Sequence, residues 1–586
     1  MTGRSQTGQH QVDPTLHGQS HGSTQHQVSD DHASDDQAWS SPTGSSRSSH
    51  ESDNYTSTEI VEDGMLAIPL CTDPHSVRQL RRAVGRPIIN KDTLHAIDLD
   101  EIEKNIKLRI DINFDHHINF SPSGGRNAED KQMVSAEYWE ALAAELKILC
   151  QHNIMAKCDE CEERLKLGET TQYHFRPRLE KFLVTLKELL MTMTQYHEWD
   201  QICHYLDVSL RMQEASHGML DASWLGQWLS RLLIRHCAPV RDAMAREMAR
   251  TIDEGMEKGD FFIITDGIRQ LFELLEVMKL DVANNSLRRK RYSLIDDTVK
   301  FQRGYFRNRM EAGRIMVRSS RLWFQMATER HESCPQYPLQ PRSPPLAALV
   351  HGLVSIAAKP NFSIPESLFY DTRRINFVQR RVQDLVNLRL CFDVFEGLVY
   401  KMMGLEETGD RGNSALQNCI ETQRRDLKAR LLDLYEDTST ERDTTEEIED
   451  DNTSHIALEI LRSASVVIGE MQKTEPEPLS DDLVEDANDL LQEAFEREAD
   501  TMGYITPLVL ELEETAQAQA RAYENMTPLA ISDAQKRWAE QRWAAKERPL
   551  IVTVEDLARR IAHISVIHCR VWADLLYLAP DELFEA

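Results

Sequence analysis

The residues from Arg109 to Phe120 read RIDINFDHHINF and combine two aspartates, two asparagines and two adjacent histidines. Carboxylates and imidazoles are the side chains that bind metal ions and carry out acid–base catalysis. This stretch is therefore the first candidate for a metal site or a catalytic cluster.

Apolar and polar side chains alternate through this stretch, which predicts an extended segment with two different faces. The apolar face would hold Leu108, Ile110, Ile112, Phe114, His116, Ile118 and Phe120. The adjacent histidines would then point to opposite sides, and Asp115 and His117 would lie about 7 Å apart on the polar face. We interpret 108–120 as a short extended segment that packs against helices. A metal site with Asp111, Asp115 and His117 remains the alternative.

A second candidate is the CxxC pair formed by Cys158 and Cys161. A zinc site would need a second pair of ligands at a usual spacing. Only His152 and His174 flank the pair. We therefore expect a structural or incidental role for the two cysteines, with a zinc or redox role as the alternative.

A third candidate is the basic run Arg288, Arg289, Lys290 and Arg291, which precedes Ser293. Basic residues two and three positions before a serine resemble the substrates of basophilic kinases, including the cAMP-dependent one. Ser293 is thus a candidate phosphorylation site. The alternatives are an ordinary solvated helix face and a nuclear-import signal.

Composition narrows the classes of function. The chain has 586 residues, a net charge of −29 and 41% apolar residues. Such an excess of negative charge opposes binding to nucleic acid, whose phosphates require Lys and Arg. The first residues lack the apolar core of a secretory signal, and no run is long enough to span a membrane. We expect a cytoplasmic protein, with a nuclear location as the alternative, whose partners are proteins.

The elements that would position these candidates are helices. From about residue 135 onward, apolar residues recur at intervals of three and four, which is typical of amphipathic helices. Asp221 and Asp260 are expected to cap helices, and Pro239 is expected to begin one. The sequence therefore predicts an all-α protein, a large multi-helix domain with the short extended segment near 108–120.

The organisation along the chain follows from composition. Residues 1–95 are expected to form a mostly disordered tail, because the Ser- and His-rich N-terminal part has few large apolar residues. Residues 96–332 would form the first half of the helical domain and 346–586 the second half. The Pro-rich stretch 333–345 is interpreted as a linker or loop. An acidic flexible insertion is expected at about 404–454.

The absence of several short catalytic motifs argues against an enzyme. The chain contains no phosphate-binding G-x4-G-K-[ST], no G-x-G-x-x-G and no H-E-x-x-H. Triads can assemble from distant residues, so these absences lower the expectation of catalysis without settling it.

Several blocks in order resemble a known family. They are LRIDINFDHHINFSP, RPRLEKFLVTLKELL, WLSRLLIRHCAPVRDAMAREM and the run from FELLEVMKLDVANN through KFQRGYF. The chain resembles the T-complex protein 11 family, especially fungal members described as suppressors of lost cAMP-dependent kinase activity. CAPVRD (237–242) and MKLDVAN (278–284) are its most specific parts. The resemblance is clear over about 105–310 and looser through 370–400 and 455–575.

This resemblance implies an all-α, non-enzymatic regulator or adaptor, with no catalytic residues and no cofactor. It also implies protein partners in the cAMP and protein kinase A pathway. The family blocks supply candidate partner-binding residues, namely Cys237, Pro239, Arg241, Asp242 and Asp281. A structural role for these residues is the other interpretation. A metal-dependent hydrolase using Asp and His residues, or a cytoskeletal or membrane-surface adaptor, are the alternative functions.

Overall fold

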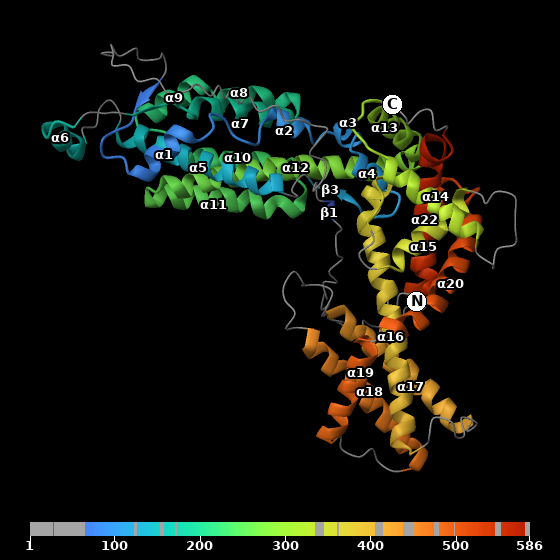
Figure 1. Cartoon of the computed structure of the whole chain (residues 1–586). Helices are drawn as coiled ribbons and strands as arrows, with labels where there is room; N and C mark the ends of the chain where they lie inside the picture. The colour runs from blue at the N-terminus through green and yellow to red at the C-terminus, as the bar shows by residue number, and fades with distance from the viewer. Residues whose placement is uncertain are drawn as a thin grey trace, which may run out of the picture. The chain divides into compact units, whose positions relative to one another are not determined.

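The structure is a computed structural model, in which the chain divides into two compact units (Figure 1). Unit 1 comprises residues 1–102 and 117–288, and unit 2 comprises 103–116 and 289–586. The division falls inside one helix, α12, between Arg288 and Arg289. The residues described are 27–28, 65–121, 126–152, 158–169, 173–333, 345–359, 363–404, 414–437, 449–473, 480–496, 498–544 and 553–579.

In the part of unit 1 that the structure describes, the chain forms helices and four very short strands. Its elements are β1 (Gln27–Val28), β2 (Leu66–Ala67), α1 (Pro74–Arg82), α2 (Lys91–His95), α3 (Leu99–Ile102), β3 (Asn119–Phe120), α5 (Arg126–Gln151), α6 (Asp159–Lys166), β4 (His174–Phe175), α7 (Leu179–Met193), η1 (Tyr196–Glu198), α8 (Trp199–Tyr205), α9 (Val208–Ser216), α10 (Ala222–Ile234), η2 (Pro239–Arg241), α11 (Asp242–Lys258) and most of α12 (Phe261–Asp296). Strand β1 pairs in parallel with β3, and β2 pairs antiparallel with β4.

Local sequence signals fix several of these helices. The Asp221 carboxylate accepts a hydrogen bond from the Trp224 backbone N–H at 2.9 Å and caps α10. Asp260 caps α12 in the same way through the Phe262 N–H at 2.8 Å. Between α11 and α12, Gly259 adopts the left-handed conformation with φ 63°. Both expected caps are confirmed.

Helix α11 lies alongside α10 and α12 (Figure 1). A glycine permits the close approach of α11 and α12, since a Cβ at Gly267 would lie 2.5 Å from a side-chain carbon of Ile252. This antiparallel pairing carries the start of α11 towards the middle of α12.

Among its described residues, unit 2 has helices joined by turns and loops and no strand. Its elements are α4 (Ile106–Asp111), the end of α12, α13 (Thr298–Glu311), α14 (Arg318–Glu332), α15 (Pro345–Ala357), η3 (Glu366–Asp371), α16 (Thr372–Met402), α17 (Ser414–Asp437), α18 (Glu449–Gln472), α19 (Asp481–Glu496), α20 (Glu498–Tyr523), α21 (Pro528–Ala544), α22 (Val554–Trp572) and η5 (Ala573–Tyr577).

Two apolar cores stabilise unit 2. One joins α15, α20 and α22 to the first half of α16, with α15 contributing Leu349 and Val354. The other joins the second half of α16 to α17, α18 and α19. Among the described helices, none combines the length and the apolar character that crossing a membrane would require. The all-α fold class is confirmed.

Two predicted boundaries need correction. Residues 65–95, expected in the disordered tail, form β2, α1 and α2, where Leu80 and Leu94 are buried. Residues 414–437, expected in the flexible insertion, form α17, which contributes Leu416, Ile420, Leu427 and Leu431 to the second core of unit 2 at helical spacing. The rest of the expected tail apart from β1, residues 334–344 of the Pro-rich stretch, and residues 405–413 and 438–448 of the insertion lie outside the described residues.

The prediction of an extended segment at 108–120 is also largely wrong. Residues 106–111 form helix α4, capped by the Asn105 side chain, which accepts from the Leu108 N–H at 3.0 Å. Turns follow, and only Asn119–Phe120 is a strand. Apolar residues at every second position include pairs four apart, such as Ile106 and Ile110, which share one face of a helix. The N-cap at Asn105 was the local signal that favoured a helix here.

Candidate functional site

The two most specific family blocks meet in unit 1. Pro239 begins the short helix η2, which leads directly into α11 at Asp242. The Arg241 guanidinium donates two hydrogen bonds to the carboxylate of Asp281 on α12, at 2.9 and 3.1 Å. This bidentate geometry is the strong form of an ion pair. These hydrogen bonds raise the pKa of Arg241. The structure thus brings together two predicted residues from separate blocks.

The other two predicted residues of this group stand beside the pair. The Cys237 thiol lies 3.6 Å from an oxygen of Asp242. Asp242 also accepts a hydrogen bond from Arg246 one turn along α11, at 3.1 Å. Burial and the Asp242 carboxylate raise the pKa of the Cys237 thiol. Cys237 is therefore held as an unreactive thiol, which fits a structural contribution.

Apolar side chains flank the Arg241–Asp281 pair and face solvent. Val240 precedes Arg241 and is 74% exposed, and Val282 follows Asp281 and is 61% exposed. Met244 is also exposed in the first turn of α11. We call Val240, Arg241, Met244, Asp281 and Val282 the family-block surface. Exposed apolar groups around a fixed arginine are the composition that protein interfaces favour.

The polar residues of RIDINFDHHINF act as structural hydrogen-bonding groups of unit 2. The buried Asn113 amide donates to the carbonyls of Arg109 and Ile110 at 3.0 and 2.9 Å. It also donates to the Thr298 hydroxyl at 3.1 Å. The His116 ring hydrogen-bonds the Ser532 carbonyl at 3.1 Å, as expected for a hydrogen-bonded core histidine.

The alternative metal site in the same stretch is not assembled. Asp111 forms an ion pair with Arg374, which also binds Asp371 at 2.8 Å. Within the described part of the chain, neither of the two side-chain groups with metal-binding geometry includes Asp111, Asp115 or His117. The histidine pair therefore gives no support to a hydrolase.

The basic run before Ser293 does not form one solvated face. Arg291 is only 8% exposed, and its guanidinium donates to the carbonyls of Ile112 and Asp115 at 2.8 and 2.6 Å. Lys290 pairs with Glu103 at 2.7 Å. Arg288, Arg289 and Ser293 are exposed on α12, and the Ser293 hydroxyl donates to the Lys290 carbonyl at 2.8 Å. The basic residue two positions before Ser293 is therefore an anchor of the fold.

Phosphorylation of Ser293 stays a prediction. The burial of Arg291 adds an expectation about how fast a kinase would phosphorylate the folded chain. A kinase that reads Arg291 must open the end of α12. An opening that costs more than about 1.4 kcal/mol lowers the competent population tenfold. We expect the catalytic subunit of a cAMP-dependent kinase to phosphorylate the folded chain at Ser293 at least about tenfold more slowly than a peptide of residues 286–300. Mass-spectrometric time courses measure both rates, and equal rates would contradict the expectation.

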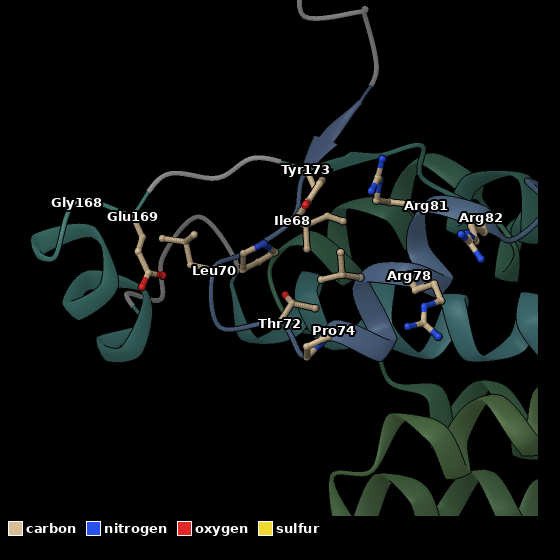
Figure 2. A pocket seen from close by; sticks show the side chains of 12 residues that line it. Ile68, Leu70, Thr72, Pro74, Arg78, Arg81, Arg82, Gly168, Glu169 and Tyr173 are labelled. Carbon is tan, nitrogen blue, oxygen red and sulfur yellow. The ribbon is translucent and has the colours of Figure 1, made fainter. Parts of the chain in front are cut away.

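A pocket of about 960 Å³ lies beside α1 in unit 1 (Figure 2). Arg78, Arg81 and Arg82 line it, and the Arg81 guanidinium lies 4.6 Å from the ring centre of Tyr173. Glu169 is the acidic residue of the lining. Several guanidinium groups in one pocket favour an anionic ligand. Its wall also includes Leu70 and Thr72, the neighbours of Cys71.

Cys71 completes a cluster with the CxxC pair and with His152, which flanks that pair in the sequence. The ligand atoms of Cys71, His152, Cys158 and Cys161 lie within 4.8 Å of one another, whereas the flanking His174 is not part of the group. Burial and hydrogen bonds with the neighbouring thiols raise the pKa of Cys71 to about 12. A hydrogen bond from the Cys161 backbone lowers the pKa of Cys158. No local spacing pointed to Cys71, because it lies 87 residues before Cys158 and the helices from α1 to α5 come between them.

A second cluster joins three helices of unit 2. His331 on α14, His351 on α15 and Glu513 on α20 lie together in the interior. One Glu513 oxygen is 2.9 Å from Nδ1 of His351 and 3.8 Å from Nδ1 of His331. Burial opposes the charge on Glu513, but its interactions with the two histidines outweigh burial and hold its pKa at about 2. The Glu513 carboxylate and the His351 imidazole thus form a hydrogen-bonded pair inside unit 2.

A family model described as T-complex protein 11 matches residues 108–581. The chain belongs to the T-complex protein 11 family. The match covers the family-block surface, Ser293 and the His331 cluster, and it begins after Cys71. The resemblance seen in the sequence blocks is thereby confirmed.

Relatives within the T-complex protein 11 family include fungal and mammalian proteins. The chain is 29% identical over 319 residues to Protein SOK1 of Saccharomyces cerevisiae, covering 53% of this chain and 34% of that protein. It is 25% identical over 233 residues to human T-complex protein 11-like X-linked protein 1, covering 37% and 44% respectively. It is 22% identical over 322 residues to the rat T-complex protein 11 homolog, covering 50% and 53%. The chain thus spans about a third to a half of these relatives, and no solved structure matches it.

Proposed function

We propose that this chain is a non-enzymatic helical regulator that acts through protein–protein contacts in the cAMP-dependent kinase pathway. Membership of the T-complex protein 11 family and the similarity to Protein SOK1 support the helical regulator. The resemblance to fungal suppressors of lost kinase activity supports the pathway.

The observation that carries this proposal is the family-block surface. Arg241 of CAPVRD and Asp281 of MKLDVAN are 40 residues apart in sequence, yet they pair on adjacent helices. Val240 and Val282 contribute little to the stability of unit 1 itself, because both side chains face solvent. A partner that covers them would remove apolar area from water, which is the main driving force of association. The Arg241–Asp281 pair would fix the register of that contact.

The net charge of −29 indicates the kind of partner. An acidic protein attracts basic surfaces and raises the rate of encounter with them, most strongly at low ionic strength. We therefore expect a partner with an apolar patch bordered by basic residues, and an association rate that falls as salt is added.

The double substitution Val240→Glu and Val282→Glu is expected to abolish partner binding without unfolding the chain. Each change places a charge in the apolar part of the surface, and loss of a central interface contact costs about 2 kcal/mol or more, so affinity should fall at least tenfold. Affinity purification followed by mass spectrometry, with the kinase subunits tested directly by pull-down, measures the effect.

The matched control is Met316→Glu, which adds a charge to a side chain that is 81% exposed and lies elsewhere in the chain. It should leave binding unchanged. Identical partner sets for the control and the double variant would remove the family-block surface from the proposal. Absence of kinase-pathway components from the wild-type sample would remove the pathway instead.

A further inference from the structure

We propose that Cys71, His152, Cys158 and Cys161 bind one zinc ion, which fixes helix α6 to the rest of unit 1. Three thiols and one imidazole form a donor set that structural zinc sites use, and zinc prefers four such ligands in a tetrahedron. The pair spaced as CxxC comes from the start of α6, and the other two ligands come from separate segments of the chain.

The distances between the donor atoms fit this geometry. The sulfurs of Cys71 and Cys158 are 3.9 Å apart. Two sulfurs bound to one tetrahedral zinc, each at the usual Zn–S distance, lie about 3.8 Å apart. The Cys71 sulfur lies 3.1 Å from Nε2 of His152. All three cysteines are free thiols, and a separation of 3.9 Å is far beyond a disulfide bond.

The supporting framework for two of the ligands is rigid. Cys71 lies in the loop between β2 and α1, and His152 directly follows α5. A small apolar core of Ile68, Leu80, Ala144 and Phe175 packs these segments together, with Ile148 against it one turn before His152. The loop and the end of α5 are therefore held in place before any metal binds.

Helix α6 lacks such a framework. None of its eight residues is buried. In Figure 1 it stands apart from α1 and α5 at the end of the unit. Arg164 donates to the Leu70 carbonyl at 2.8 Å, and this contact lies beside the cysteine cluster. A helix this short is unstable by itself in water. A metal bound by Cys158 and Cys161 at its first turn supplies the attachment that an apolar core supplies elsewhere.

The N-terminus of α6 suits this role. Cys158 occupies the N-cap position in an extended conformation and Cys161 lies three residues later, so both side chains face the same side. The cap has no side-chain hydrogen bond. Backbone N–H groups at a helix start stabilise negative charge, here the charge of metal-bound thiolates.

The test is the zinc content of the purified full-length chain, prepared with a reductant and without chelator and measured by inductively coupled plasma mass spectrometry. We expect about one zinc ion per chain. The double variant Cys158→Ser and Cys161→Ser should lose at least nine-tenths of it, and His152→Ala should weaken zinc binding by about tenfold or more in competition with a chromophoric chelator. Circular dichroism should remain nearly unchanged, because α6 contributes no buried residue.

Two matched controls separate ligands from neighbours. Cys150→Ser changes a thiol two residues before His152, and His174→Ala changes the histidine that flanks the CxxC but lies outside the cluster. Both should keep full zinc content. Alkylation mapped by mass spectrometry gives a second measure: Cys71, Cys158 and Cys161 should be protected until a chelator is added.

Either of two results overturns the proposal. One is a wild-type chain that stays metal-free after incubation with zinc under reducing conditions. This result counts against the site even if Cys158 and Cys161 form a disulfide when the chain is exposed to air. The other is zinc that the double cysteine variant retains in full.

Discussion

Replacing Arg291 by leucine is expected to lower the free energy of unfolding of unit 2 by about 3 kcal/mol. The guanidinium donates to the Ile112 and Asp115 carbonyls from a side chain that is almost fully buried. Leucine would leave both carbonyls without this donor, and each buried unsatisfied carbonyl costs about 1–3 kcal/mol. Hydrogen exchange of peptides covering 106–116, followed in increasing urea, measures the loss within this unit.

The control for this variant is Arg288→Leu, three residues earlier on the same helix. Arg288 is exposed, and surface substitutions usually change stability by about 0.5 kcal/mol or less. Equal stability of the two variants would show that Arg291 is dispensable for the fold. In that case the basic run would again be a plausible kinase recognition sequence in the folded chain.

Glu513→Gln is expected to have an effect of similar size on unit 2, because breaking one partner of a buried charge network costs about 3–5 kcal/mol. Glutamine has nearly the same shape, but it carries no charge, and its single carbonyl oxygen replaces a carboxylate that contacts both His331 and His351. The change in the free energy of unfolding is measured at pH 7 by urea titration, with hydrogen exchange of peptides from α15 and α20 as the probe.

The same substitution should alter how stability depends on pH. The pKa of Glu513 is lowered from 4.5 to about 2 in the folded chain. A carboxyl group with a lowered pKa stabilises the fold above its unfolded pKa, and this contribution is lost as the pH falls from about 4.5 towards 2. The shift corresponds to about 3 kcal/mol. The difference between wild type and Glu513→Gln should therefore be largest at pH 7 and shrink below pH 4.5.

Glu514→Gln is the matched control, because Glu514 is the exposed neighbour of Glu513 on the same helix. Its unfolding curve should follow that of the wild type at every pH. If the gap between wild type and Glu513→Gln stays constant down to pH 3, the carboxylate does not titrate as described, and packing alone would account for the lost stability.

Local signals were sufficient wherever a few neighbouring residues decide the conformation. The caps at Asp221 and Asp260 and the helix start at Pro239 are such cases, because the groups that bond are within three residues of one another. The family resemblance was also visible in the sequence, from the order of its characteristic blocks. RIDINFDHHINF shows the limit, since its alternation fits a strand and also places residues four apart on one helical face.

The role of this stretch depended on distant partners. Asn113, Arg291 and Ser532 are far apart in sequence, yet the Ser532 hydroxyl donates to the Asn113 carbonyl at 2.9 Å. Arg291 donates to the carbonyls of Ile112 and Asp115 on either side of Asn113. Side chains whose types suggest chemistry instead form hydrogen bonds with backbone groups that lack a helical or sheet partner. Sequence alone could list these donors and acceptors but could not pair them.

The sequence by itself determined the helical class, several helix starts and the family of this protein, because these depend on periodicity and on neighbours within one or two turns. The tertiary structure decided which polar residues meet. Arg241 and Asp281 are 40 residues apart, Cys71 and His152 are 81 apart, and His351 and Glu513 are 162 apart. Such pairs form only when packing of apolar helix faces brings their helices together, and no local pattern records that packing.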